Sequence, residues 1–93
     1  MVTPDSAWTL AMCRAAAVPV AAAHGLEVDA YIEGANGRSA VRFDLHRGGG
    51  ITCWIALDTS TLEACADEPA VHALVERELA AVLQMRHGAG ASA

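Results

Sequence analysis

Between residues 28 and 57 the chain alternates apolar with polar side chains in three separate runs. This period of two is typical of strands that bury one face and expose the other. The apolar positions are Val28, Ala30 and Ile32, then Val41, Phe43 and Leu45, then Ile51, Cys53, Ile55 and Leu57. We therefore predict three half-buried strands, over residues 28–33, 41–46 and 51–57.

The dipeptide Asn36-Gly37 separates the first two runs. Asn-Gly favours a two-residue type I′ hairpin turn, because both residues adopt positive φ at low cost. Pairing outward from this turn places Ala30 opposite Phe43, and every apolar side chain of the two strands then lies on one face.

Three glycines, residues 48–50, separate the second run from the third. A two-residue loop would place Leu45 opposite Thr52 and mix apolar and polar side chains on each face. A three-residue loop instead places Leu45 opposite Cys53 and Phe43 opposite Ile55. We expect the three-residue loop, because it keeps the apolar side chains on a common face.

Residues 1–25 predict an N-terminal helical segment. Thr3 is suited to cap a helix that starts at Pro4. Pro19 is expected to stop or kink this helix, with Gly25 closing any last turn. The apolar stripe of the helix is thin and consists of Trp8, Met12 and Ala15.

Two more helices are expected after the third strand. The capping box Ser60–Glu63 opens a short helix, and Pro69 begins a longer one that Asp67 caps and Gly88 ends. An apolar stripe runs along the longer helix at Val71, Leu74, Val75, Leu79, Val82 and Leu83. This amphipathic helix is predicted to lie across the apolar face of the sheet.

These elements predict an α+β fold. A three-stranded antiparallel meander packs against a long C-terminal helix, with an N-terminal helix and a short helix after the third strand. Residues 1–93 form one domain, and residues 88–93 form a disordered tail. A chain this short buries only roughly 60–65% of its unfolded surface, so self-association is a reasonable way to gain buried area.

Charge and composition exclude several classes. The chain has six Arg, no Lys and eleven acidic residues, a formal net charge of −5, which disfavours direct binding to nucleic acid. No uncharged apolar run approaches the roughly 20 residues of a membrane span. A signal peptide is not expected for the apolar stretch 15–23, because no positively charged n-region precedes it, Asp5 lies where Lys or Arg belongs, and Arg14 breaks the apolar stretch. Three scattered cysteines indicate reduced thiols, so we expect a cytoplasmic protein.

Neither a metal nor a cofactor site is indicated. There is no Cys-x-x-Cys pair, and no histidine lies at ligand spacing from the cysteines. The glycines at residues 48–50 join two strands, whereas a phosphate loop leads from a strand into a helix. We read Cys53 as a small hydrophobic residue of the core.

The outer face of the predicted sheet carries the best candidate residues. They are Tyr31, Arg42, Asp44, His46 and Trp54, with Asp29 and Glu33 beside them. Two interpretations compete. Either the N-terminal helix covers this face, or it is an exposed patch whose Trp, Tyr and Arg side chains bind a protein partner. A His46 general base would need a nucleophile, and the predicted face holds neither Ser nor Cys.

Part of the chain resembles a small bacterial family catalogued as domain of unknown function 1488. The resemblance rests on Ser39-Ala-Val-Arg-Phe43, Gly50-Ile-Thr-Cys-Trp-Ile55, Leu62-Glu63 and the amphipathic helix that follows, with Tyr31 as an upstream aromatic residue. It covers about residues 31–86 and leaves the N-terminal segment without a counterpart. It implies an α+β fold and no established activity or catalytic residue.

The first functional hypothesis is a non-catalytic protein-interaction or regulatory module, which acts as a homodimer or with a protein partner. An alternative is a small ligand-binding protein or enzyme that uses the outer face around His46 and Trp54. A third is an acidic decoy that blocks a basic nucleic-acid-binding protein. The three hypotheses remain open at this point.

Overall fold

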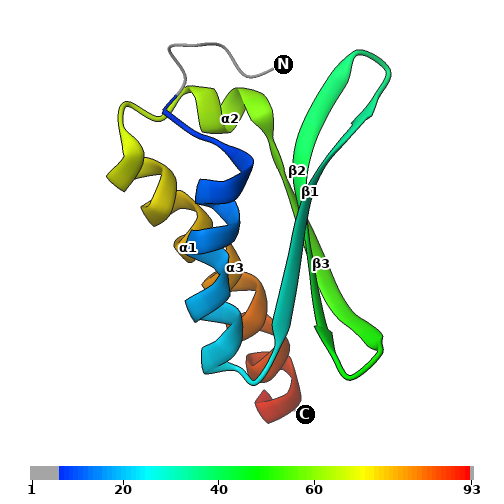
Figure 1. Cartoon of the computed structure of the whole chain (residues 1–93). Coiled ribbons are helices and arrows are strands. Elements are labelled where there is room, and N and C mark those ends of the chain that lie inside the picture. Colours follow the sequence, from blue (N-terminus) through cyan, green and yellow to red (C-terminus); the bar gives the residue numbers. More distant parts are fainter. Residues whose placement is uncertain (1–6, 93) are drawn as a thin grey trace.

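The computed structural model describes residues 7–92, without the side chains of residues 35 and 86–92. Its elements, shown in Figure 1, are α1 (Leu10–Ala23), β1 (Glu27–Ala35), β2 (Arg38–Arg47), β3 (Gly50–Asp58), α2 (Thr59–Glu63) and α3 (Glu68–Ser92). The strands form one antiparallel sheet in the order β1-β2-β3. The predicted α+β fold is therefore confirmed.

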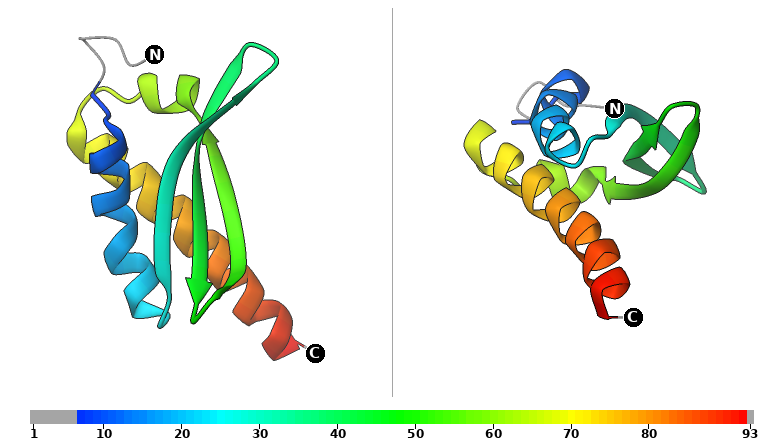
Figure 2. Two further views of the ribbon diagram at one scale, coloured as in Figure 1. Left: turned by 45° about the vertical axis from the view of Figure 1, so that its right-hand side comes forward. Right: turned by 90° about the horizontal axis from the view of Figure 1, so that it is seen from below.

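Helices α1 and α3 lie side by side on one face of the sheet, which we call the inner face (Figure 2). Helix α1 lies against β1 and against α3. The interpretation that the N-terminal helix covers the outer face is therefore wrong. Among residues 7–92, no element lies over that outer face (Figure 2).

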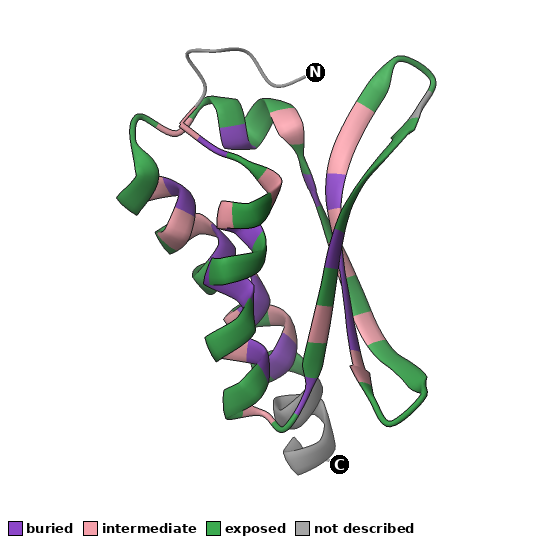
Figure 3. Ribbon diagram, viewed as in Figure 1, coloured by how far each residue is buried: buried purple, intermediate pink, exposed green. Residues whose placement is uncertain are grey.

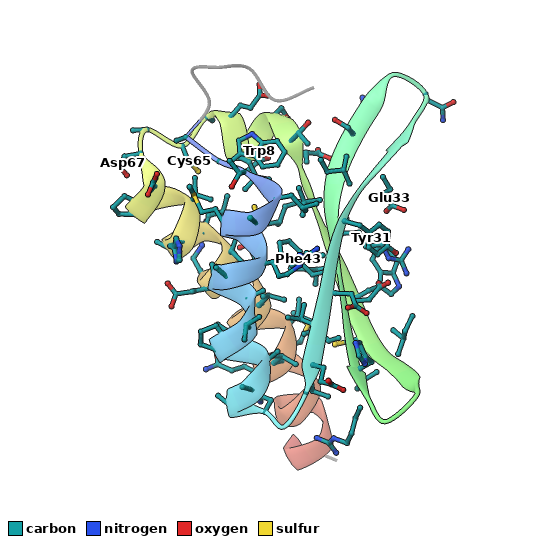
Figure 4. The ribbon with its side chains drawn as sticks, viewed as in Figure 1. Trp8, Tyr31, Glu33, Phe43, Cys65 and Asp67 are labelled. Carbon is teal, nitrogen blue, oxygen red and sulfur yellow. The ribbon has the colours of Figure 1, made fainter. Side chains whose placement is uncertain are left out.

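The core lies between the helices and the inner face. Val41, Phe43 and Leu45 of β2 are fully buried, and Figure 3 shows buried positions where the helices meet the sheet. The helices contribute Cys13, Ala16, Ala17, Ala21, Leu62, Val71, Val75, Leu79 and Leu83. Trp8, which precedes α1, is also buried in this core (Figure 4).

The first hairpin follows the predicted register. Asn36 and Gly37 have φ of 55° and 76°, as a type I′ turn requires, and Ala30 pairs with Phe43. Not every inner position is covered, however. Ile32, near the hairpin end, is 48% exposed, although its partner Val41 on β2 is fully buried.

The second hairpin reaches the predicted pairing by a different route. Leu45 pairs with Cys53 and Phe43 with Ile55, but the turn has two residues, Gly48 and Gly49. A register shift beyond Leu45 leaves Thr52 as an extra residue in β3. This bulge shifts the register by one residue, which is the shift that we expected from a longer loop. The prediction of a three-residue turn is therefore wrong.

The bulge also changes the side on which one residue lies. Ile51 pairs with His46 of the outer face and is 58% exposed, although the alternation predicted an inner position. A bulge places two residues opposite one, so the alternation shifts by one position beyond it.

Helix α1 starts later than expected and continues through the proline that was expected to stop or kink it. Thr9 caps it, accepting a hydrogen bond from the Met12 amide, so the helix begins at Leu10. The predicted cap Thr3 and first residue Pro4 lie outside the described residues. The helix continues through Pro19, which is exposed, to Ala23. An exposed proline leaves the carbonyl of the preceding turn accessible to water, which lowers the cost of the missing hydrogen bond.

Gly25 closes α1 as predicted. It has φ of 70°, and the amides of Gly25 and Leu26 donate to the carbonyls of Ala22 and Ala21. This pair of bonds is a Schellman motif, in which a left-handed residue lets the chain leave the helix. The motif directs the chain into β1.

The C-terminal helices agree with the prediction in position but not at every end. Asp67 caps α3 by accepting a hydrogen bond from the Ala70 amide at 2.9 Å. Helix α2 includes Ser60, so Ser60 is not its cap, and α3 continues past Gly88 to Ser92. Glycine inside a helix costs about 1 kcal/mol relative to alanine and does not by itself end the helix.

Candidate outer-face site

The five candidate residues lie together on the outer face, and we call them the outer-face cluster. They are Tyr31 of β1, Arg42, Asp44 and His46 of β2, and Trp54 of β3. The register places Tyr31 opposite Arg42 and Asp44 opposite Trp54, as predicted. In Figure 4, Tyr31 and Glu33 lie on the side of the sheet away from the helices, whereas Phe43 lies toward them.

Asp44 is the centre of the cluster. Its carboxylate accepts a hydrogen bond from the Tyr31 hydroxyl at 2.9 Å and another from Arg42 Nε at 2.7 Å. The residue is only 8% exposed, although it lies on the uncovered face. The neighbouring Tyr31, Arg42 and Trp54 side chains therefore shield it from solvent.

The electrostatics of Asp44 follow from this arrangement. Burial acts to raise the pKa of the carboxyl group, but the hydrogen bonds from Arg42 and Tyr31 outweigh it and hold the pKa below its ordinary value. The hydrogen bond to Asp44 raises the pKa of Tyr31 in turn. The cluster therefore holds a carboxylate, a guanidinium and a neutral phenol at neutral pH.

Arg42 links the carboxylate to the exposed tryptophan. Its guanidinium carbon lies 4.2 Å from the centre of the Trp54 ring, which is a cation–π stack. Arg42 Nη1 also lies 4.0 Å from a carboxylate oxygen of Glu33. Trp54 nevertheless remains 53% exposed. An ordered aromatic ring that faces solvent is the feature that most distinguishes this surface.

His46 lies at the other end of the cluster. Its Nε2 is 3.1 Å from an Asp29 oxygen, but the contact lacks hydrogen-bond geometry, and its Nδ1 is 3.9 Å from Glu27. Both carboxylates are largely exposed. The structure therefore places His46 beside two exposed carboxylates and not beside a nucleophile.

Sequence reasoning overlooked two outer-face residues. Glu27 was not singled out, although it precedes Asp29 by two positions and so continues the same alternation. Ile51 was assigned to the inner face, and only the bulge brings it out. The pattern alone contains no indication of the bulge.

The cysteines lie on or near the inner side of the fold. All three are free, and Cys13 is buried while Cys53 and Cys65 are half-buried. Burial raises the pKa of the Cys13 thiol to about 11, with a smaller contribution from Cys65. Within residues 7–92, excluding the undescribed side chains, no three metal-binding side chains gather in one place.

A hollow of about 490 Å³ opens near the end of the first hairpin. It is lined by Gly37, Arg38, Ser39, Asp58, Thr59 and Ser60. The hydroxyl groups of Ser39 and Thr59 form a hydrogen bond with each other there, with their oxygens 2.8 Å apart. None of the outer-face cluster lines this hollow, so the cluster presents a surface and the hollow is a separate feature.

Comparisons with protein-family models, curated proteins and solved structures give no match to this chain. The resemblance to domain of unknown function 1488 stays a prediction. In the part of the chain that the structure describes, no helix has the length and apolar character needed to cross a bilayer.

Proposed function

We propose that this protein is a non-catalytic protein-interaction module that self-associates. We also propose that its outer-face cluster is the surface that binds a protein partner. The observation that carries the proposal is the Arg42–Trp54 stack, which Asp44 holds on a face that no described element covers. Tryptophan, tyrosine and arginine are the side chains most enriched at the energetic centres of protein interfaces.

The preorganisation of these side chains supports the proposal. Ordering a long side chain at an interface costs about 0.5–1.5 kcal/mol, and this cost lowers affinity. Asp44 already fixes Arg42 in the free protein, and Arg42 stacks on Trp54. A partner that docks on the ring therefore meets a surface whose rotamers are already selected.

The chemistry of the face favours binding over catalysis. His46 is paired with exposed carboxylates, and Asp44 is held ionised between two donors. General acid–base work needs a group whose pKa lies near the working pH, which the ionised Asp44 does not provide. The three cysteines are free, and reduced thiols support a cytoplasmic location as part of this proposal.

Capture of a partner by matched baits tests this proposal. Immobilised wild type, Trp54→Ala and Tyr31→Ala are compared with Met85→Ala, which removes another exposed hydrophobic side chain, from α3. We expect extract of the native source to yield a protein that wild type and Met85→Ala retain. The two outer-face variants should each lose at least about tenfold of it, because truncating a central interface residue costs about 2 kcal/mol or more.

The result that would contradict the proposal is equally specific. If all four baits retain the same proteins in the same amounts, the outer-face cluster is not a binding surface. Circular dichroism of each variant provides the control that the fold is intact, since Tyr31 and Trp54 lie outside the core.

A further inference from the structure

The two edges of the sheet differ in how far they are protected. An exposed edge strand presents unpaired amides and carbonyls, and proteins blunt such edges with charges or covering side chains. The edge formed by β1 carries Glu27, Asp29 and Glu33, and Arg14 Nη2 donates to the carbonyl of Ala30 at 3.0 Å. This edge has both kinds of protection.

The edge formed by β3 has neither. From Gly50 to Leu57 the strand carries no charged residue and no proline, and its only charge is Asp58 at the end. Among the described residues, no side chain donates to a carbonyl of β3 in the way that Arg14 does on β1. The inner positions Cys53 and Ile55 are also only half-buried. The strand thus offers both open backbone groups and apolar side chains that the core covers only in part.

We infer that two copies of this chain join through β3, antiparallel about a two-fold axis, to form a continuous six-stranded sheet. A second copy is the occupant that the charges favour. Two β3 strands bring together uncharged segments, whereas pairing β3 with the acidic, capped β1 edge would also generate an open-ended chain of copies. The symmetric arrangement uses the same edge of both copies, so it stops at a dimer.

The side chains select a register with Ile55 on the axis. Residues 53–57 lie beyond the bulge and form the regular part of β3. In this register Trp54 lies opposite the small Ala56 of the second copy, and Cys53 lies opposite Leu57, so large side chains meet smaller or flexible ones. Thr52 then lies opposite Asp58, whose carboxylate forms no capping hydrogen bond to α2.

The inference rests on the self-association in the proposed function but not on the outer face as the contact between copies. Edge pairing leaves both outer-face clusters exposed on the same side of the enlarged sheet. Because the contact is a short strand pair, we expect a weak dimer, with a dissociation constant on the order of micromolar.

A charge pair at position 52 tests the register. Thr52 is exposed at the bulge, so neither Thr52→Lys nor Thr52→Glu disturbs the core. Lysine would face Asp58 of the other copy twice per dimer, and glutamate would repel it. We expect Thr52→Lys to tighten the dimer and Thr52→Glu to weaken it, each by roughly tenfold, since each dimer contains two such exposed charge pairs and each pair is individually weak.

The measurement is sedimentation equilibrium over a wide concentration range at low salt. Ala73→Lys and Ala73→Glu, at an exposed position of α3, are the controls, because they change the net charge equally at a site away from β3. The inference is overturned if the Thr52 variants only match these controls, or if wild type stays monomeric throughout.

Tyr31→Ala separates this inference from the proposed function. Tyr31 lies on β1, two strands away from the axis, so edge pairing predicts an unchanged dimer. A dimer that Tyr31→Ala dissociates is joined face to face, which overturns the edge model and leaves the outer face as a binding surface. Loss of partner capture with an intact dimer supports both the edge model and the outer face as the partner-binding surface. Unchanged capture with an intact dimer leaves the edge model in place and contradicts the proposed partner-binding surface.

Discussion

Strand β2 has two faces that are stabilised by different forces. Val41, Phe43 and Leu45 point inward and are completely buried under two helices. Arg42 and Asp44, between them, point outward and are fixed by hydrogen bonds and a ring stack. The inner face derives its stability from the area it removes from water, and the outer face from a few directed contacts. Mutation, thiol reagents and pH should therefore affect the two faces differently.

The largest expected difference concerns the two aromatic residues Phe43 and Trp54. Phe43→Ala empties a fully buried site and should lower the free energy of unfolding by about 3–5 kcal/mol. Trp54→Ala removes a side chain that is half in solvent and should cost less than about 1 kcal/mol. Urea denaturation of both variants beside wild type measures the difference.

A milder substitution, Phe43→Leu, guards against complete unfolding of the alanine variant. It should retain the fold at an intermediate cost, because it leaves a smaller cavity. Equal losses for Phe43→Ala and Trp54→Ala would show that the two faces do not differ in the way described.

The rates at which the three thiols react report how deeply each cysteine is buried on the inner side of the fold. The pKa of Cys13 is raised to about 11, so at pH 8 its thiolate fraction is on the order of 100-fold below that of an ordinary thiol. A thiol-specific disulfide reagent should modify the half-buried Cys53 and Cys65 first and Cys13 only slowly. Cys13→Ser is the control and should abolish only the slow phase. Three equal rates would place Cys13 at the surface.

The smallest of these effects is a pH dependence on the outer face. The pKa of Asp44 is lower in the folded protein than its ordinary 3.8, so its ionisation stabilises the fold above that pH. This contribution is lost as the pH falls through the folded-state pKa. Asp44→Asn should lower stability by about 1–3 kcal/mol at neutral pH, and its deficit should shrink on acidification.

Denaturation curves between neutral pH and pH 3 measure the effect of Asp44→Asn. Asp29→Asn is the matched control, because Asp29 is an exposed carboxylate on the same face, and it should cost less than about 0.5 kcal/mol. A deficit for Asp44→Asn that stays constant with pH would mean that the carboxylate charge contributes nothing.

The strands and their pairing were predictable because pattern and turn chemistry agree. Asn36 and Gly37 specify a turn, and a slip by one residue would expose Phe43, so only one register remains. The glycine turn was less certain, because a two-residue turn with a bulge gives the same pairing of Leu45 with Cys53 as a longer loop. Pairing rules fix which side chains meet, not the backbone path between them.

The N-terminal helix was predicted to exist, but its buried stripe was predicted only in part. Of the expected residues, Trp8 is buried and Met12 is half-buried against the core, whereas Ala15 is exposed. The buried residues of the helix itself are Cys13, Ala16, Ala17 and Ala21. Alanine occupies both sides of this helix, so the pattern contains little contrast from which to choose a face. Small side chains instead allow α1 to approach β1 and α3 closely, which only the tertiary structure shows.

The membership of the outer-face cluster followed from the alternation, but its internal contacts did not. Strand register places Tyr31 opposite Arg42, yet the hydroxyl of Tyr31 reaches diagonally to Asp44. Such diagonal contacts depend on side-chain rotamers, which an apolar–polar pattern does not encode. Whether a helix covers the face likewise depends on packing between distant segments.

The extra residue in β3 gives this hairpin an unusual tolerance of length. Deleting Thr52 would join Ile51 directly to Cys53 and leave the pairs His46–Ile51 and Leu45–Cys53 in place. Deleting Trp54 would instead turn Cys53, which lies between it and the bulge, to the opposite side of the sheet. A hairpin of this kind can lose one residue during divergence without exchanging its apolar and solvent-facing sides, provided that the deletion falls at position 52.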